Sequence, residues 1–223
     1  MTTASRDLEV CLARRWGIVA GMDEVGRGAL AGPVAVGVAV IGIDAPPVPE
    51  GLTDSKALTA RRREALVDPV REWALASAVG YASPQEIDDW GIIAALRLAG
   101  RRALAEVAGH GLVPGGVLLD GSHDWLSTPD DLFGAIDGPD DPFGVDLPVQ
   151  MQVKADASCA VVAAASVLAK VERDHLMQEL EDPGYGWASN KGYGSAAHTR
   201  AIVELGVSEH HRRSWKMPTQ ATK

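Results

Sequence analysis

The sequence predicts a mixed α/β fold in which a β-sheet is flanked by helices and the C-terminal part is helical. Strand-like apolar segments outnumber long helices in the first part of the 223-residue chain. Helices dominate the later part, where an alanine-rich segment is followed by a second helical stretch. Strands and helices distributed in this way are typical of one sheet covered by helices.

Five segments are expected to be strands because each is short, apolar and bounded by turn-forming or charged residues. In order, these expected strands are 16–23, 34–41, 74–82, 117–120 and 149–154. The second is rich in valine and is expected to pair with the first. Residues 1–15 precede them and are expected to form a short arm with one or two helical turns.

The expected helices carry apolar residues at helical spacing. They are 58–73, 87–108, 156–180 and 196–205. Pro69 is expected to end or kink the first helix because proline has no N–H to donate. Residues 83–86, Ser-Pro-Gln-Glu, are typical of a helix start. Gly91 and Gly100 are expected weak points in the second helix.

Three stretches are expected to be irregular. Prolines force a loop near 46–49, and residues 185–195 form a glycine-rich loop. Residues 121–148 are rich in Asp, Gly and Pro and exceed the length of a usual connection. Their composition predicts a solvated loop that is dispensable for chemistry, and their acids would disfavour a nearby DNA strand. A basic tail that contains Trp215 follows the last helix.

Composition limits the classes of function. The chain has 46% hydrophobic and 23% charged residues, an ordinary balance for a globular protein. Its formal net charge of −9 argues mildly against nucleic-acid binding by bulk electrostatics, but it allows a local basic track beside an acidic metal centre. Two cysteines are too few for a disulfide framework or a four-cysteine zinc site. No signal-peptide core or bilayer-spanning run is visible, so we expect a cytoplasmic location and no membrane partner.

The chain is organised around residues 22–28, Met-Asp-Glu-Val-Gly-Arg-Gly. Two adjacent carboxylates, Asp23 and Glu24, end the first expected strand. Because neighbours on a strand point to opposite faces, they could converge on one ion only at a strand end. Gly26 and Gly28 permit positive φ and a close approach of backbone amides to a ligand. A polar hairpin corner is the alternative interpretation of this short pattern.

Two further acids lie at the ends of expected elements. Asp120 ends a strand and Asp156 begins the alanine-rich helix. Each has a structural alternative, a turn for Asp120 and a helix N-cap for Asp156. Together with Asp23 and Glu24, they would repel one another unless divalent cations neutralised them. Mg²⁺ and Mn²⁺ prefer carboxylate ligands, and a pair of such ions can activate water for phosphodiester hydrolysis.

Six blocks of the sequence carry a resemblance to one family. They are GMDEVGRG at 21–28 with Gly32 and Pro33, LTDSK at 52–56 with Leu58, LDG at 119–121, VKAD at 153–156 with the helix through Lys170, Arg173 and Asp174, NKGYG at 190–194 with His198, and HRRSW at 211–215. Over almost its whole length, the chain resembles type 2 ribonuclease H, the bacterial ribonuclease HII family. The first block is highly specific, whereas the last would be weak alone. The family pattern usually has Gly in place of Ala155, and residues 122–148 exceed the expected length.

The resemblance implies a ribonuclease H-like fold, with a catalytic domain at 1–180 and a C-terminal loop, helix and basic tail at 181–223 packed on it. It implies a metal-dependent endonuclease, using Mn²⁺ or Mg²⁺, that hydrolyses the RNA strand of RNA–DNA hybrids. It also implies incision 5′ of single ribonucleotides embedded in duplex DNA. The products would be 5′-phosphomonoesters, and the enzyme would be a monomer.

The resemblance also assigns site residues, position by position. The metal-site and catalytic carboxylates would be Asp23, Glu24, Asp120 and Asp156. The residues that read the ribonucleotide and its junction with DNA would be Gly26, Arg27, Gly28 and Tyr193. A tyrosine between two glycines has little to pack on, which favours an exposed ring that contacts a sugar or base. Lys56 and Lys191 lie in matched motifs and are candidate phosphate contacts.

Other charged residues have two interpretations each. The arginines at 61–63 form either a solvated helix face or part of a DNA track. The histidines at 210–211 suggest a metal site or a proton shuttle, but packing of the tail explains them better. Lys170 and Asp174 have the i, i+4 spacing of a helix ion pair.

Two other classes of function compete with a nuclease. A small-molecule α/β enzyme could use the Gly-Arg-Gly turn for phosphate, but the chain lacks the G-x-G-x-x-G spacing there. A protein could instead bind hybrids without cutting them, but acids at all four positions argue against it. Product formation that depends on a divalent metal distinguishes both from the nuclease.

Overall fold

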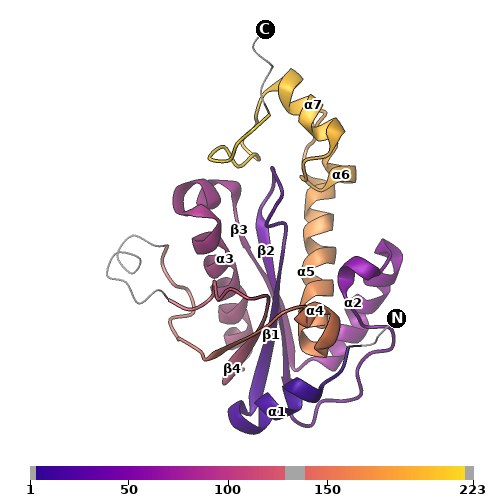
Figure 1. Ribbon diagram of the computed structural model, residues 1–223, viewed down its shortest axis with the longest axis vertical. Helices are drawn as coiled ribbons and strands as arrows, with labels where there is room; N and C mark the ends of the chain where they lie inside the picture. Colours follow the sequence, from indigo (N-terminus) through magenta and orange to yellow (C-terminus); the bar gives the residue numbers. More distant parts are fainter. Residues whose placement is uncertain (1–3, 129–138, 219–223) are drawn as a thin grey trace.

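The structure is a computed structural model that describes residues 4–128 and 139–218. Its core is one five-stranded sheet in the order β3-β2-β1-β4-β5, with α3 on one face and α5 on the other (Figure 1). The strands are β1 (Ile18–Val25), β2 (Val34–Gly42), β3 (Ala76–Ala82), β4 (Gly116–Asp120) and β5 (Val149–Gln152). The helices are α1 (Asp7–Trp16), the 3₁₀ turn η1 (Ser55–Ala57), α2 (Ala60–Trp73), α3 (Pro84–Gly109), α4 (Ala155–Ser158), α5 (Ala160–Glu179), α6 (Trp187–Asn190) and α7 (Ala196–Leu205).

The sheet is mixed, as the sequence predicts. β1 pairs antiparallel with β2, and β2 pairs antiparallel with β3. β4 runs parallel to β1, and β5 runs parallel to β4. The expected pairing of the first two strands is confirmed. Because β4 ends one residue after the pair Met22–Leu119, β1 continues beyond the end of its neighbour.

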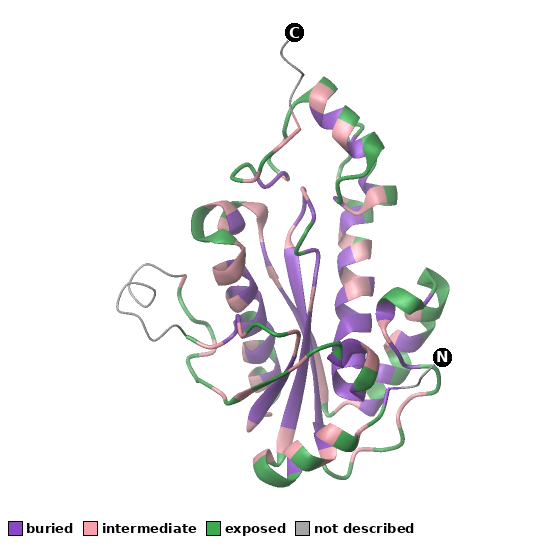
Figure 2. Ribbon diagram, viewed as in Figure 1, coloured by how far each residue is buried: buried purple, intermediate pink, exposed green. Residues whose placement is uncertain are grey.

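Alternation along the strands separates two apolar layers. Val19 and Val25 of β1 pack in the layer that contains α5, whereas Ala20 and Met22 pack in the layer that contains α3. Figure 2 shows the sheet and the facing sides of these helices buried. Burial of apolar area on both faces is the main term that stabilises such a sheet.

The alanine-rich composition of α5 follows from how closely it packs. A Cβ added at Gly37 of β2 would lie 2.2 Å from the carbonyl oxygen of Ala165. A Cβ at Gly21 of β1 would lie 2.6 Å from the backbone of Val161. Only small side chains allow the helix backbone to approach the sheet to this distance. The small residues of both elements therefore fix the position of α5 over the centre of β1.

Several boundaries differ from the sequence-based predictions. β1 continues through Glu24 to Val25, because those residues still pair with β2, so the two acids lie within the strand and do not end it. The expected helix at 156–180 is broken at Cys159, which has extended φ and ψ, into α4 and α5. Asp156 is therefore not the N-cap of the long helix. The expected glycine-rich loop at 185–195 contains the short helix α6.

The N-terminal helices also differ in detail. α1 has 10 residues and is longer than the expected one or two turns. α2 continues past Pro69 to Trp73, so the proline does not end it. The start of α3 is confirmed, because Ser83 and Glu86 form a reciprocal capping box. Gly91 interrupts α3 with φ of 77°, as expected for a weak point. Gly100 instead lies against Met22 and Trp125, where a Cβ would be crowded.

The prediction of a solvated loop at 121–148 is wrong for part of the described residues. Trp125 and Leu126 are buried and pack with the layer that contains α3. The guanidinium of Arg101, from α3, donates to the carboxylate of Asp146 at 2.5 Å and lies 3.3 Å from that of Asp141. Arg101 itself is 3% exposed. Because a buried charge that loses its partners is costly, the segment has a structural role. Residues 129–138 lie outside the described ranges, and the dispensability of the segment for chemistry stays a prediction.

The C-terminal elements pack around a third apolar cluster. It contains Ala31 from the β1–β2 connection, Met177 from α5, Tyr185 and Trp187 around α6, and Ala201 and Ile202 from α7. Figure 1 shows α6 and α7 at the end of α5 that is farthest from α1. The division into a domain at 1–180 and an appended part at 181–223 stays a prediction.

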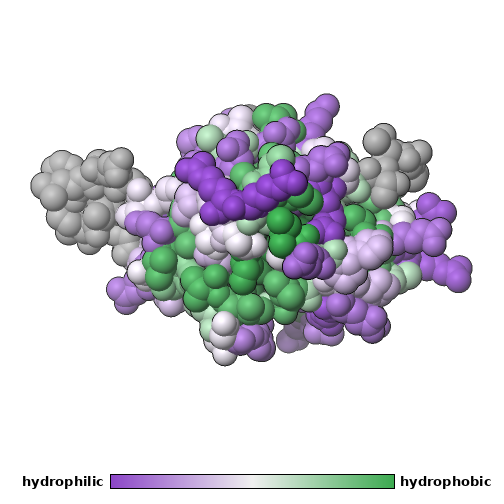
Figure 3. Space-filling model, turned by 90° about the horizontal axis from the view of Figure 1, so that it is seen from below, coloured by the Kyte–Doolittle hydropathy of each residue, from purple (hydrophilic) through white to green (hydrophobic). Residues whose placement is uncertain are grey.

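The opposite end of the molecule has a different surface. Figure 3 looks from below and shows hydrophobic side chains gathered on this face with hydrophilic ones around them. The large hydrophobic residues that stay exposed in the structure include Ile43, Leu75 and Val113. None of the helices in the described ranges combines the length and apolar composition that a bilayer span requires.

Candidate active site

The parallel pairing of β1 and β4 brings two of the predicted acids to the same level of the sheet. Leu119 pairs with Met22, so Asp120 follows beside Asp23. Asp120 is the last residue of β4, whereas β1 continues for two more residues. The two acids thus lie at the edge where β4 ends and only β1, β2 and β3 continue. Such strand ends are where open α/β sheets place their sites.

Asp23 is nearly buried, with 3% of its surface exposed. One carboxylate oxygen accepts a hydrogen bond from the amide of Glu24 at 2.8 Å. Ser166 of α5 also bonds to this carboxylate, and Ser166 in turn lies 2.9 Å from the hydroxyl of Ser55. The pKa of Asp23 is raised to about 7, first by burial and then by the charges of Glu24 and Asp120, while the hydrogen bond from Ser166 acts in the opposite direction. The carboxylates of Asp23, Glu24 and Asp120 therefore repel one another, and nearby positive charge does not fully offset this repulsion.

Asp120 links β4 to the helix that carries Asp156. Its carboxylate accepts a hydrogen bond from the amide of Ala155 at 2.7 Å, and the amide of Asp156 also bonds to it. Burial and the charge of Asp156 nevertheless raise the pKa of Asp120. Asp156 is buried at 5% exposure and pairs with the ammonium of Lys56 at 3.1 Å. Three predicted acids and one predicted lysine are therefore in mutual electrostatic contact.

These residues border an open cleft. Its volume is about 560 Å³, and it is lined by Asp54, Lys56, Asp120, Gly121, Lys154 and Asp156 among others. Lys154 has left-handed backbone with φ of 58°, which turns the chain from β5 into α4. The cleft gives solvent and a ligand access to the acids of β4 and α4. Glu24 is less buried than Asp23 and pairs with Arg27 at 3.2 Å.

The chemistry of these side chains fits a hard divalent cation. Carboxylate oxygens are the ligands of Mg²⁺ and Mn²⁺, and a cation would stabilise the ionised carboxylates of Asp23 and Asp120, whose pKa values are raised first by burial and then by neighbouring acids. Within the described ranges, however, no three such side chains are already close enough to hold an ion. An ion shared by several of these acids therefore requires side chains to turn from their present partners, which are Arg27 for Glu24 and Lys56 for Asp156.

The Gly-Arg-Gly turn lies immediately after β1. Gly26 has φ of 82°, and a Cβ there would lie 2.0 Å from the guanidinium of Arg173, so only glycine fits. Gly28 does not use positive φ, and the space beside it is open. Of the two glycines that permit positive φ, only Gly26 therefore adopts it. Arg27 and Gly28 are exposed, so this turn presents backbone groups to solvent near the acids.

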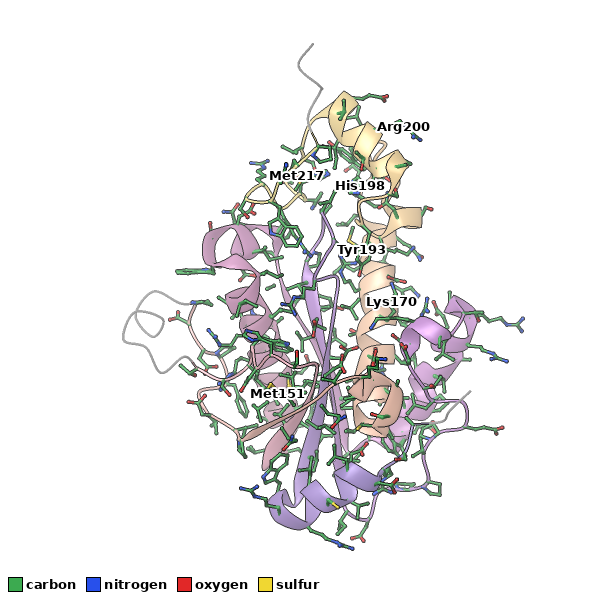
Figure 4. The ribbon with its side chains drawn as sticks, viewed as in Figure 1. Met151, Lys170, Tyr193, His198, Arg200 and Met217 are labelled. Carbon is green, nitrogen blue, oxygen red and sulfur yellow. The ribbon has the colours of Figure 1, made fainter. Side chains whose placement is uncertain are left out.

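Tyr193 lies between α6 and α7, in a segment that is hydrogen-bonded to the β1–β2 connection through Gly192. It is 37% exposed, and the guanidinium of Arg173 and the ammonium of Lys170 are 5.6 and 5.9 Å from its ring centroid. In Figure 4 it lies beside α5, above Lys170 and below His198. A cleft of about 410 Å³ is lined by Lys170, Lys191 and Tyr193. The exposed ring that the sequence predicts is thus confirmed, beside basic side chains.

Two buried arginines that sequence reasoning did not single out hold these loops together. Arg212 donates to the carbonyl oxygens of Gly26 and Arg27 at 2.6 and 2.7 Å. Arg173 donates to the carbonyl oxygens of Pro33 and Lys191 at 2.8 and 3.0 Å. Both arginines lie in sequence blocks that match the family, and this match was the one sequence feature that could have pointed to them. Their partners are backbone carbonyls distant in sequence, so no spacing rule reveals the contacts.

The remaining predictions have clear outcomes. Lys170 and Asp174 form the expected helix ion pair at 2.6 Å. Arg63 donates to the carbonyl oxygens of Ser55 and Leu58, so it stabilises the turn that carries Lys56. Arg61 and Arg62 are exposed. The histidines at 210–211 belong to the tail and pack against Trp187 of α6, so the expected packing role is confirmed.

The mixed sheet thus gathers acids at the end of β4 beside β1, an arrangement that fits a metal-dependent hydrolase. The family model "Ribonuclease HII" matches residues 20–218. Ribonuclease HII of Streptomyces avermitilis is 46% identical over 200 residues, which cover 89% of this chain and 76% of the relative. Ribonuclease HII of Paracoccus denitrificans is 46% identical over 202 residues, covering 88% and 84%.

Solved structures agree with the fold. The chain superimposes on the ribonuclease HII of an Archaeoglobus fulgidus complex with PCNA with a TM-score of 0.60, at 26% identity, covering 92% of this chain and 98% of that chain. For Bst ribonuclease HIII in complex with Mn²⁺, the TM-score is 0.56 at 21% identity, covering 85% and 63%. This chain belongs to the ribonuclease HII family. It is a divalent-metal-dependent endoribonuclease that acts on RNA–DNA hybrids.

Proposed function

We propose that this enzyme also incises duplex DNA 5′ of a single embedded ribonucleotide, with Mn²⁺ or Mg²⁺ held by the acids of β1, β4 and α4. The observation that carries the proposal is the register of β1 and β4, which brings Asp120 beside the buried Asp23. Glu24 and Asp156 complete the proposed set of ligands. Two ions fit this number of carboxylates better than one, because a single ion would leave surplus negative charge in the site.

The protein residues prepare the site for hydrolysis. When bound, the ions would activate a water and stabilise the leaving oxygen of the phosphodiester. Asp23 is kept in one orientation by Ser166 and by the amide of Glu24. Asp120 is kept in place by the amide of Ala155. Water adds its oxygen to phosphorus as the P–O3′ bond breaks, and a proton goes to the departing 3′ oxygen. The downstream fragment then carries a 5′-phosphate.

We assign recognition of the ribonucleotide to the turn at 26–28 and to Tyr193. The 2′-OH can donate and accept hydrogen bonds and is the chemical difference between RNA and DNA at one nucleotide. Backbone groups at Gly28 can approach it because the space beside this residue is open. The ring of Tyr193 is available to contact the adjacent sugar. Lys56 and Lys191 are proposed phosphate contacts, since Lys56 borders the cleft beside the acids and Lys191 borders the cleft beside Tyr193.

We further propose that the chain acts as a monomer, and its location in the cytoplasm stays a prediction. A complex with PCNA is known for the archaeal relative described above. The described part of the C-terminal tail of this chain is held by its own fold, because the amides of Arg213 and Ser214 donate to the carboxylate of Asp88 at 2.9 Å. That contact supports an ordered tail that does not require a partner for its position.

A cleavage assay on matched duplexes tests the proposed activity. We expect incision of an RNA–DNA hybrid and of a DNA duplex with one ribonucleotide when Mn²⁺ or Mg²⁺ is present. We expect no incision of the all-DNA duplex and none of any duplex in excess EDTA. Binding of the hybrid without metal-dependent products would instead support a protein that recognises hybrids without cutting them. Products from the hybrid but none from the single-ribonucleotide duplex would contradict the proposed substrate range.

A further inference from the structure

The C-terminal tail contains a buried pair of histidines that no step of the proposed mechanism uses. His198 of α7 and His211 of the tail are 0% and 1% exposed. Their Nε2 atoms lie 3.1 Å apart. The Nδ1 atom of His198 lies 2.9 Å from the carbonyl oxygen of Tyr193. At the other end, Nδ1 of His211 accepts from the amide of Ser208 at 3.0 Å.

The partners at the two ends fix the protons between them. A backbone amide can only donate, so Nδ1 of His211 is an acceptor and the proton of this ring is on Nε2. The carbonyl of Tyr193 can only accept, so Nδ1 of His198 carries a proton and its Nε2 is the acceptor. The result is one continuous chain of donors that runs from Ser208 through His211 and His198 to Tyr193. Every ring nitrogen in this chain is satisfied while both histidines are neutral.

Burial favours this neutral arrangement. The pKa of His211 is lowered to about 4, first by burial and then by the charges of His198, His210 and Arg213. The ring of Tyr185 packs against His211 edge-on with centroids 4.7 Å apart. His211 therefore has one protonation state and one orientation near neutral pH. A residue that positions another group needs both.

Arg212, the residue after His211, contacts the turn that follows β1. Arg212 donates to the carbonyl oxygens of Gly26 and Arg27, in the turn after β1. The amides of Leu30 and Ala31, which follow this turn, donate to the carbonyl oxygen of Gly192 at 2.8 and 3.2 Å and so tie it to the residue before Tyr193. Consecutive tail residues thus fix Tyr193 on one side and the Gly-Arg-Gly turn on the other.

We propose that His211 acts through His198 as a positioning residue for Tyr193, and that discrimination of the ribonucleotide junction depends on this histidine relay. The inference rests on the proposed role of Tyr193 in reading the junction. In Figure 4, His198 lies directly above Tyr193 along the same side of the molecule. The carbonyl of Tyr193 also accepts from the amide of Ser195 at 2.8 Å. Loss of the relay therefore removes one of the contacts that position Tyr193 without leaving its carbonyl unpaired.

The test compares three variants on two substrates. His211→Phe keeps a ring of similar size but cannot donate to His198. His211→Gln keeps an N–H that can reach the same acceptor. His210→Phe is the matched control, because His210 is adjacent in sequence and packs on Trp187 but takes no part in the relay. We expect His211→Phe to lower kcat/KM on the single-ribonucleotide duplex by roughly 5- to 10-fold, with a smaller loss on a long hybrid. His211→Gln is expected to recover most of the loss, and His210→Phe to stay within about 2-fold of the unchanged protein.

A double-variant comparison separates positioning from general destabilisation. In the Tyr193→Ala background, His211→Phe is expected to add less than about a 2-fold loss, because it acts through the missing ring. Equal losses on both substrates, or the same loss with and without Tyr193, would overturn the proposal.

A measurement on the unaltered protein keeps the relay testable even where a variant fails to fold. ¹⁵N NMR of the imidazoles reports the protonated nitrogen of each ring. We expect Nδ1–H at His198 and Nε2–H at His211. A proton on Nε2 of His198 would refute the relay. Since this measurement needs no substrate, its result stands whether or not the proposed cleavage at single ribonucleotides is observed.

Discussion

Asp23→Asn and Asp120→Asn are each expected to lower the cleavage rate of an RNA–DNA hybrid by at least about 10³-fold, on the order of 4 kcal/mol of transition-state stabilisation. Asparagine keeps the size of the side chain but removes the charge that holds a divalent cation. The measurement is single-turnover cleavage at saturating Mn²⁺ or Mg²⁺.

The fold is expected to survive both substitutions. The raised pKa of Asp23 means that its ionised form is unfavourable in the metal-free protein. A neutral amide at this position should therefore leave the Tm unchanged or higher in the absence of metal. Asp89→Asn is the matched control, because Asp89 is exposed on α3 away from the acids. A well-folded Asp120→Asn enzyme with near-normal turnover would remove Asp120 from the site.

Tyr193→Ala is expected to lower kcat/KM on the single-ribonucleotide duplex by at least about 10-fold, roughly 1.4 kcal/mol. Because 37% of Tyr193 is exposed in the structure, its ring is accessible to a sugar. A long hybrid offers several cleavage registers, and we expect a smaller loss there.

Tyr193→Phe provides the control for the ring itself. It keeps the aromatic surface and removes the hydroxyl, so retained activity would assign the effect to ring contact. Metal binding by Asp23 and Glu24 should be unaffected by either substitution, because these acids lie in β1 whereas Tyr193 lies between α6 and α7. Equal and small losses of kcat/KM on both substrates would mean that Tyr193 only packs its loop and that the junction is read elsewhere.

The sequence singled out the acids because each lies in a short, specific block beside a recognisable strand or helix, and their role in holding metal stays a prediction. It also predicted the order of strands and helices, since their apolar periodicity is clear. It placed the end of β1 too early, because whether Glu24 still pairs with Val36 depends on the partner strand. The break at Cys159 was missed for a similar reason: alanines on both sides favour one continuous helix.

The contacts that organise the site were the least predictable. Arg173 and Arg212 bind backbone carbonyls, and any residue type can supply a carbonyl. Trp125 and Leu126 lie in a stretch whose composition indicates a solvated loop, yet they are buried against α3. His198 and His211 are 13 residues apart in the chain and meet only because the tail returns to the end of α5. Local pattern cannot reveal such tertiary contacts.

The chemistry of the cleaved ends tests the central claim most directly. The duplex carries one ribonucleotide, is labelled on both sides of it, and is cut by the unaltered enzyme with Mn²⁺ or Mg²⁺. Attack by an activated water predicts a cut on the 5′ side of the ribonucleotide, with a 3′-hydroxyl upstream and a 5′-phosphate on the ribonucleotide. A cut on the 3′ side that leaves a 2′,3′-cyclic phosphate would show attack by the 2′-OH instead. That result would contradict hydrolysis at a site built from Asp23, Glu24, Asp120 and Asp156.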